Sequence, residues 1–167
     1  MKKCIVSYSK TGNNQALAQK VAESIGAEHI SIKINRSMFA MVLDIMFGTK
    51  PKARTNTAVI DSFDEVSFAG PIWMGKVASP LRRFLLHAKK SGKPYRFFTI
   101  SGGSLNSNPG LRSDIIKYGG DKLTKQIEMY KFDLIGNKGA TAKDTMDYHL
   151  TEADLDMLTK SLADKLA

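Results

Sequence analysis

Short apolar runs alternate with helical patterns along this chain, and this alternation restricts the fold more than any other feature. Residues 3–8, 28–34, 66–70 and 95–100 predict strands, and a fifth strand falls within residues 126–135. The first run hardly alternates between apolar and polar residues, which is typical of a strand buried on both faces. Strands separated by helices favour a mostly parallel sheet with helices on both faces. We therefore expect an α/β fold.

Several helices have recognisable ends. The helix over residues 11–25 stops at Gly26, and the last helix begins at Thr151 with Asp154 as the second half of a capping box. Ser79 predicts the cap of a further helix, which carries a proline in its first turn. The apolar stripe of that helix predicts that its basic residues face outward, namely Arg82, Arg83, Lys89 and Lys90.

Length and composition fit one compact domain. The 167 residues are 43% hydrophobic, which suffices for a sizeable core over residues 1–167. The longest apolar runs are shorter than the roughly 18 residues of a membrane span, and the start of the chain lacks the pattern of a secretory signal, so we expect a cytoplasmic protein. Cys4 is the only cysteine and the three histidines are far apart, so we expect neither a disulfide nor a metal site.

The net charge of +9 is unevenly distributed. No Asp or Glu occurs from Val66 to Ser113, whereas eight lysines and arginines do. This segment predicts a basic face for acidic partners or anionic substrates, and the alternative is the solvated surface of a basic protein. Nucleic-acid binding is not expected, because the basic residues are not interleaved with aromatic ones.

Three polar loops each follow a predicted strand, at Ser9 to Asn14, Pro71 to Lys76 and Ser101 to Asn106. The carboxyl ends of parallel strands meet at one edge of a sheet, so these loops predict a shared ligand crevice. The first loop also precedes a helix, whose free N–H groups favour a phosphate, unless the loop is an ordinary helix cap. The spacing of a Walker A loop is absent, which argues against an NTPase.

These residues carry a resemblance to a known family. Tyr8 to Asn14 resembles the FMN-phosphate loop of the flavodoxin family, in which a hydroxyl residue precedes Thr-Gly and two polar positions. Gly70 to Gly75 resembles the second flavin loop of that family, and Ser101 to Ser104 resembles the third. The resemblance implies a flavodoxin-like three-layer α/β/α sandwich, a five-stranded parallel sheet in order 2-1-3-4-5, and FMN as a non-covalent cofactor.

The resemblance also implies roles for the loop residues. Trp73 would stack on the flavin, although it could instead anchor its loop, and the Gly75 peptide would accept a hydrogen bond from flavin N5–H. We expect no catalytic dyad or nucleophile, because the cofactor supplies the chemistry. The implied cofactor-binding residues are Ser9, Lys10, Thr11, Gly12, Asn13 and Asn14 for the phosphate, Pro71, Ile72, Trp73, Met74, Gly75 and Lys76 for the ring, and Ser101, Gly102, Gly103 and Ser104 for its polar edge.

The chain departs from the family pattern in two respects. Asn14 stands where the family commonly has Thr, and the chain is basic where electron-carrier flavodoxins are typically acidic. Positive charge near the flavin, including that of Lys76, stabilises the reduced ring, so we expect a higher potential for full reduction than in an acidic flavodoxin.

The implied function is redox, transferring electrons between a reductant and a protein or small-molecule acceptor. A carrier would meet an acidic redox partner protein through the basic face. An enzyme would be an NAD(P)H-dependent quinone or flavin reductase, with Arg82, Arg83 or Lys76 on the nucleotide phosphate. A flavin-free binding or regulatory domain of the same fold is the third reading, and the sequence leaves homodimerisation open.

Two further segments have open interpretations. Ser37 to Gly48 is apolar on nearly every side, and it fits a buried crossover helix, an adaptable hydrophobic wall or subunit interface beside the flavin, or a membrane-surface helix. Asn137 to His149 is polar and predicts a surface loop that could close over the edge of the flavin.

Overall fold

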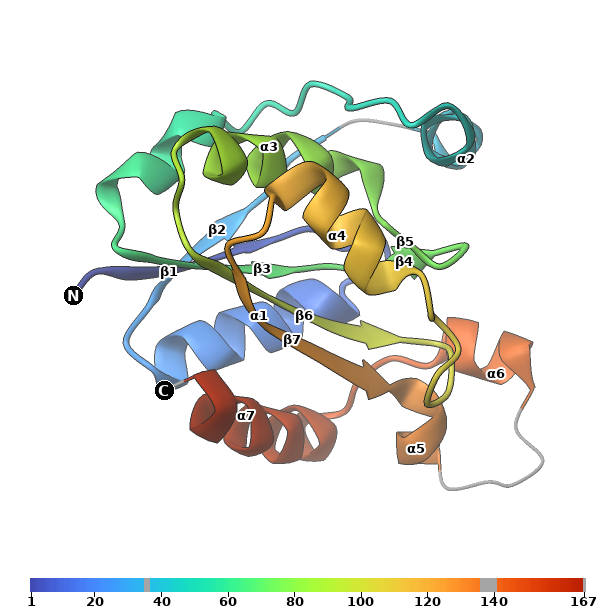
Figure 1. Ribbon diagram of the computed structural model, residues 1–167. Helices are drawn as coiled ribbons and strands as arrows, with labels where there is room; N and C mark the ends of the chain where they lie inside the picture. The colour runs from blue at the N-terminus through green and yellow to red at the C-terminus, as the bar shows by residue number, and fades with distance from the viewer. Residues whose placement is uncertain (35–36, 136–140, 167) are drawn as a thin grey trace.

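A parallel sheet runs through the middle of the molecule (Figure 1). The computed structural model describes residues 1–34, 37–135 and 141–166. The five strands lie in the order β2-β1-β3-β6-β7, and all of them pair in parallel. Numbered among themselves, these strands have the predicted order 2-1-3-4-5, which is thus confirmed. Their bounds are β1 (Lys3–Ser7), β2 (Glu28–Ser31), β3 (Glu65–Ala69), β6 (Tyr95–Ser101) and β7 (Leu123–Tyr130).

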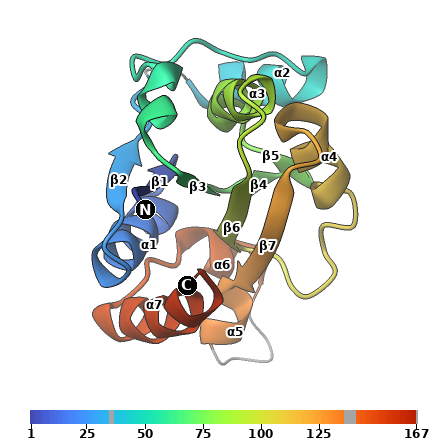
Figure 2. The same ribbon diagram turned by 60° about the vertical axis from the view of Figure 1, so that its left-hand side comes forward.

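Helices cover both faces of the sheet, as Figure 2 shows. One layer consists of α1 (Asn13–Ser24) and α7 (Glu152–Leu166), and the other contains α3 (Arg82–Lys90) and α4 (Leu111–Gly119). The α/β/α sandwich is therefore confirmed. The remaining elements are α2 (Met38–Phe47), α5 (Lys131–Ile135), α6 (Ala142–Asp147), the 3₁₀ turns η1 (Thr57–Ser62) and η2 (Ser79–Leu81), and the short strands β4 (Ile72–Trp73) and β5 (Lys76–Val77).

Alternation along the strands divides the core between the two helix layers. Cys4 and Val6 on β1 pack toward α3 and α4, whereas Ile5 packs toward α1 and α7. On β6, Phe97 packs toward α3 and α4, whereas Phe98 packs toward α1 and α7, and both are fully buried. Each such side chain contributes about 1.5–3 kcal/mol on burial. Burial also raises the pKa of the Cys4 thiol to about 12, which keeps it protonated and inert.

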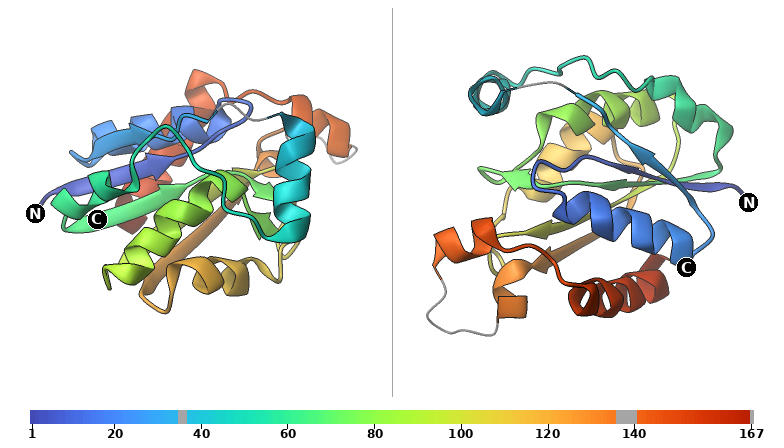
Figure 3. Two further views of the ribbon diagram at one scale, coloured as in Figure 1. Left: turned by 90° about the horizontal axis from the view of Figure 1, so that it is seen from above. Right: turned by 180° about the vertical axis from the view of Figure 1, so that it is seen from behind.

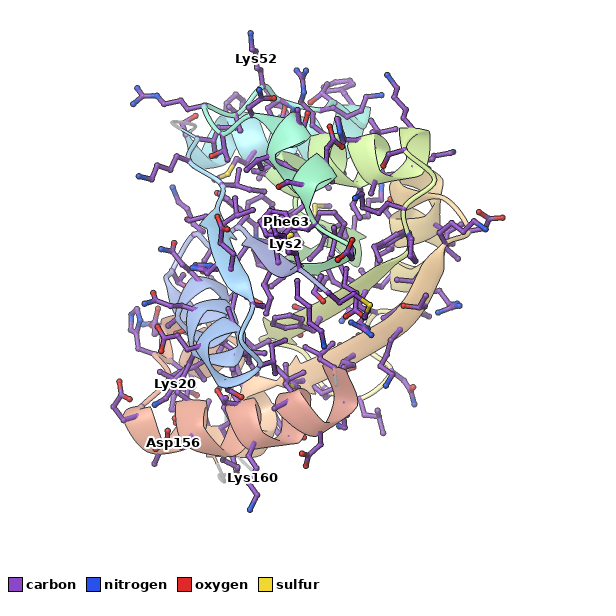
Figure 4. The ribbon with its side chains drawn as sticks, turned by 90° about the vertical axis from the view of Figure 1, so that its left-hand side faces the viewer. Lys2, Lys20, Lys52, Phe63, Asp156 and Lys160 are labelled. Atoms are coloured by element: carbon purple, nitrogen blue, oxygen red, sulfur yellow. The ribbon has the colours of Figure 1, made fainter. Side chains whose placement is uncertain are left out.

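The ends of the chain are joined on the α1–α7 face. Lys20 on α1 forms ion pairs with Glu152 and Asp156 on α7, with N–O distances of 2.8 and 2.6 Å, and Figure 4 shows Lys20 and Asp156 facing each other. The predicted capping box at the start of α7 is present. The Asp154 N–H donates to Thr151 Oγ1 at 3.2 Å, and the Thr151 N–H donates to Asp154 Oδ2 at 2.8 Å.

The outward orientation expected for Arg82 is wrong, because α2 covers that part of α3. Arg82 is fully buried, and its Nη1 donates to the carbonyl oxygens of Asp44 at 2.8 Å and Thr49 at 2.9 Å. Its guanidinium carbon lies 4.9 Å from the centre of the Tyr118 ring. A buried arginine therefore attaches the end of α2 to the rest of the protein. Arg83, Lys89 and Lys90 are exposed as predicted.

The basic face is also smaller than the sequence suggests. Arg96 donates to Glu65 at 2.7 Å, and Lys93 donates to backbone oxygens of the η1 region. The exposed cations beside α3 instead surround two surface pockets, and these cations are Lys50, Lys52, Arg54, Arg83 and Lys90.

Local structure differs from the sequence predictions at three further places. Ser79 caps no helix, because η2 precedes α3 and the Ser79 hydroxyl donates instead to Asp44 Oδ2 at 3.3 Å. The fifth strand is Leu123–Tyr130, and the rest of the predicted range forms α5. Within the predicted loop Asn137 to His149, residues 137–140 lie outside the described residues, and α6 with its own capping box at Thr141 occupies most of the remainder.

Candidate functional site

A cleft of about 640 Å³ opens at the carboxyl-terminal edge of the sheet, the right-hand side of the molecule in Figure 1. This volume lies within the usual range for small-molecule and cofactor sites. All three predicted loops contribute to its wall, so residues far apart in the sequence meet there. The lining residues from these loops are Lys10, Thr11, Asn13, Asn14, Pro71, Ile72, Trp73, Met74, Ser101, Gly102 and Gly103.

Helix α1 points an uncapped N-terminus toward this cleft. Gly12 is its N-cap residue with φ of 91°, a left-handed conformation that glycine adopts without strain, and no side chain caps the helix. The first turn contains no acidic residue. Free N–H groups and the positive end of the helix dipole thus form a seat for an anion.

The two asparagines of the first loop have their side chains occupied by other parts of the protein. Asn14 donates to the Ile100 carbonyl at 2.9 Å and accepts from the Ile100 N–H at 3.0 Å. Asn13 donates to the Tyr148 carbonyl at 2.8 Å and accepts from the Leu150 N–H at 3.0 Å. Both amides therefore position the start of α1, which leaves its backbone N–H groups as the donors that face a ligand.

The second loop is a hairpin, which the sequence did not indicate. Strands β4 and β5 pair antiparallel through a two-residue turn of Met74 and Gly75, with φ of 52° and 71°. Two positive φ values match the primed turns that suit the twist of hairpin strands. Trp73 lines the cleft and also meets Tyr8 edge to face, with ring centres 5.8 Å apart. The stacking and anchoring interpretations of Trp73 are therefore compatible.

The third loop combines a free hydroxyl with close backbone packing. Within the described part of the chain, Ser101 Oγ is buried and has no hydrogen-bond partner. A Cβ on Gly102 would lie 2.9 Å from Thr145 Oγ1, so only glycine lets α6 approach this loop. A buried hydroxyl without a partner at a cleft wall is a ready donor or acceptor for a ligand.

Five of the predicted residues do not line the cleft: Ser9, Gly12, Gly75, Lys76 and Ser104. Other lining residues were missed as site residues: Val42, Ile45, Ile100, Asn108, Lys131, Thr145, Met146 and Asp147. Two of the segments concerned carry a signal in the sequence, because Ser37 to Gly48 is apolar on nearly every side and Asn137 to His149 is a long polar connection. Lys131 offered no such signal, because it follows β7 as the first residue of α5.

Helix α2 lies beyond the ends of the strands, as the view from above in Figure 3 shows. One side of this helix contributes Val42 and Ile45 to the cleft. Its outer side exposes three large apolar side chains, those of Phe39, Met46 and Phe47. The helix is thus partly buried and also forms a hydrophobic wall beside the cleft. No helix in the described part of the chain has the length and apolarity needed to cross a bilayer.

Comparison with solved structures identifies the fold. A scan of protein-family models and a search of curated proteins find no match to this chain. Solved structures do match. A flavoprotein from Lactobacillus acidophilus in complex with FMN has a TM-score of 0.62 at 17% identity, covering 81% of this chain and 98% of that one. A flavoprotein from Bacteroides uniformis has a TM-score of 0.62 at 20% identity, covering 86% and 95%.

Flavodoxins match over nearly the whole length. A WrbA-like flavodoxin from Agrobacterium tumefaciens has a TM-score of 0.53 at 17% identity, covering 98% of this chain and 94% of that one. A flavodoxin from the domain Archaea has a TM-score of 0.55 at 16% identity, covering 98% and 97%. At these identities the likeness concerns the fold, and the fold of this chain is flavodoxin-like.

Proposed function

We propose, from its flavodoxin-like fold and its cleft, that the protein binds FMN non-covalently and transfers electrons between a reductant and a protein or small-molecule acceptor. One observation carries the proposal. The uncapped N-terminus of α1, the Trp73 hairpin and the Ser101 loop all open into one cleft. An anion seat beside an apolar, aromatic wall is complementary to a molecule that joins a phosphate to a flat ring system.

The donor set of the cleft fits FMN. The first-turn N–H groups of α1 would hold the phosphate, with Lys10 at the same loop. Trp73 and Ile72 offer an apolar surface to the ring, and the partnerless Ser101 hydroxyl offers a hydrogen bond to its polar edge. Bound FMN would supply the electron chemistry, and the protein would orient it, exclude water and tune its potential.

The same cleft has an adjoining surface suited to a redox partner. The exposed side of α2 presents Phe39, Met46 and Phe47, and the pocket next to it is lined by Lys50, Arg83 and Lys90. An apolar centre with a cationic rim suits a protein partner whose rim is acidic. This supports the carrier over the nucleotide-dependent reductase. Arg82 is buried and Lys76 lies outside the cleft, so two of the three cations considered for a nicotinamide nucleotide are unsuitably placed.

The test is the visible spectrum of the purified protein, followed by titration of the apoprotein with FMN. We expect a yellow protein and saturable binding, with a dissociation constant of about 1 μM or lower. Trp73→Ala should weaken binding, whereas Phe47→Ala, which changes an exposed side chain on the outer side of α2, should not. A colourless protein that shows no saturation with FMN would overturn the proposal and favour a flavin-free domain.

A second measurement separates carrier from reductase. The FMN-loaded protein is mixed anaerobically with NADH or NADPH, and the flavin absorbance is followed. A carrier should show no reduction on the timescale of turnover. Rapid reduction would show that the protein is a reductase.

A further inference from the structure

The wall of the cleft contains a lysine to which no loop motif assigns a role. Lys131 is the first residue of α5 and directly follows β7. The residue is 6% exposed, and it lines the cleft. Across residues 1–34, 37–135 and 141–166, its ammonium group has no hydrogen-bond or ion-pair partner.

The position of Lys131 is one where packing favours an apolar residue. Ile127 and Met129 on β7 pack toward α1 and α7, and Lys131 follows that strand as the buried first residue of α5. Burial lowers the pKa of Lys131, and only the charge of Asp147 opposes this effect. Within the described part of the chain, Lys131 Nζ is not among the side-chain atoms that are both fully buried and unpartnered, so the ammonium at the end of this buried side chain reaches the cleft. Packing therefore does not account for this residue, whereas an anionic ligand would.

Lys131 and the start of α1 line the same cleft. Asn13, in the first turn of α1, is hydrogen-bonded to the backbone of Tyr148 and Leu150. Asp147, which directly precedes Tyr148, lines the cleft and acts electrostatically on Lys131. The start of α1 and Lys131 thus both line this cleft, and the segment of Asp147 to Leu150 connects them.

We propose that Lys131 binds the phosphate of the flavin mononucleotide and makes the cleft selective for phosphorylated flavin over riboflavin. This inference rests on the proposed function. The N-terminus of α1 offers backbone donors with partial charge, whereas Lys131 offers a full positive charge in a water-poor site. Charge-assisted hydrogen bonds of this kind are the strong ones. The bound phosphate would in turn give the ammonium the partner that it lacks.

The experiment compares FMN and riboflavin as ligands of the apoprotein by fluorescence titration. For Lys131→Met, a hydrogen bond to a charged group is lost, so the dissociation constant for FMN should rise about tenfold to a hundredfold. The dissociation constant for riboflavin should stay within about twofold of that of the wild type. The control is Lys160→Met on α7, whose lysine is exposed and extends away from the helix in Figure 4, and it should change neither value.

A further variant and a further measurement guard against a folding defect. Lys131→Arg keeps the charge and should retain most of the preference for FMN. The Lys131→Met apoprotein should unfold at a higher temperature than the wild-type apoprotein, because a partly desolvated charge is replaced by an apolar side chain. A variant that binds FMN less and is less stable without it would contradict the proposal.

The remaining outcomes separate this inference from the proposed function. Unchanged FMN affinity in Lys131→Met would overturn the role of Lys131 and leave FMN binding intact. Equal losses for FMN and riboflavin would also overturn it, since Lys131 would then contact the shared part of the flavin. A wild-type protein that binds no FMN would refute the proposed function itself, and this inference with it.

Discussion

The Asn14→Ala substitution tests whether the start of α1 is attached to the sheet by a single side chain. The last β3–β6 pair is Ala69 with Phe98, so β6 continues beyond the end of β3. At Ile100 the Asn14 amide takes the place of a neighbouring strand and bonds both the N–H and the C=O. Asn14 is 4% exposed, and it lies at the wall of the cleft.

The magnitude follows from these two bonds. A buried backbone group that loses its partner costs about 1–3 kcal/mol. Two such groups at the wall of a wet cleft give a loss of about 2–4 kcal/mol in the free energy of unfolding, since water reaches part of the site. With a urea m value of about 2 kcal/mol/M, the midpoint of unfolding should fall by about 1–2 M.

The assay is urea unfolding of the apoprotein, followed by circular dichroism. Gln15→Ala is the control, because Gln15 is the exposed neighbour in the same helical turn and its removal should change stability by less than about 0.5 kcal/mol. Asn14→Thr, the residue that the flavodoxin pattern favours, should lose at least one of the two bonds and fall between the wild type and Asn14→Ala. An Asn14→Ala midpoint no lower than that of Gln15→Ala would refute the reasoning.

Three further predictions concern other parts of the structure. Gly102→Ala places a methyl group 2.9 Å from Thr145 Oγ1, so it should lower the free energy of unfolding by about 1–2 kcal/mol in the same urea assay. The control is Gly110→Ala, which has open space around the new methyl group and should cause a smaller loss. Met74→Asn should raise stability by about 0.5–1 kcal/mol in that assay, because asparagine tolerates the positive φ at this turn better than methionine. Glu65→Gln should lower the melting temperature at neutral pH, corresponding to about 1 kcal/mol, because the hydrogen bond from Arg96 holds the pKa of Glu65 below its ordinary value. That contribution is present above pH 4.5 and is lost as the pH falls through the lowered pKa, so the two melting temperatures should converge in acid; a constant difference would contradict the assignment.

Much of the architecture could be predicted because the sequence patterns that indicate it each lie within a short stretch of the chain. Strands β1, β3 and β6 are short runs rich in apolar residues, and each of the three cleft loops follows one of these runs. Once the strands are parallel, their carboxyl ends meet at one edge, and the convergence of the loops follows. The capping box at Thr151 was equally readable, since it depends on two residues three positions apart.

What was missed depends on contacts between distant segments. Periodicity shows which residues share a face of α3, but it does not show that α2 covers Arg82. The polar character of Asn13 and Asn14 predicts donors near a ligand, yet their amides bind the backbone around Ile100 and Tyr148. The sequence provides no signal for these partners, because they lie far away along the chain.

The bonds of Asn13 have a consequence for biosynthesis. The first turn of α1 emerges early from the ribosome, whereas Tyr148 and Leu150, its partners, emerge more than a hundred residues later. A nascent chain still lacking that segment has the loop that precedes α1 but not the contacts that orient it. If the protein binds FMN as proposed, stable binding should require that the segment around Tyr148 has been made, and translation arrested before Tyr148 should yield a chain that does not retain FMN.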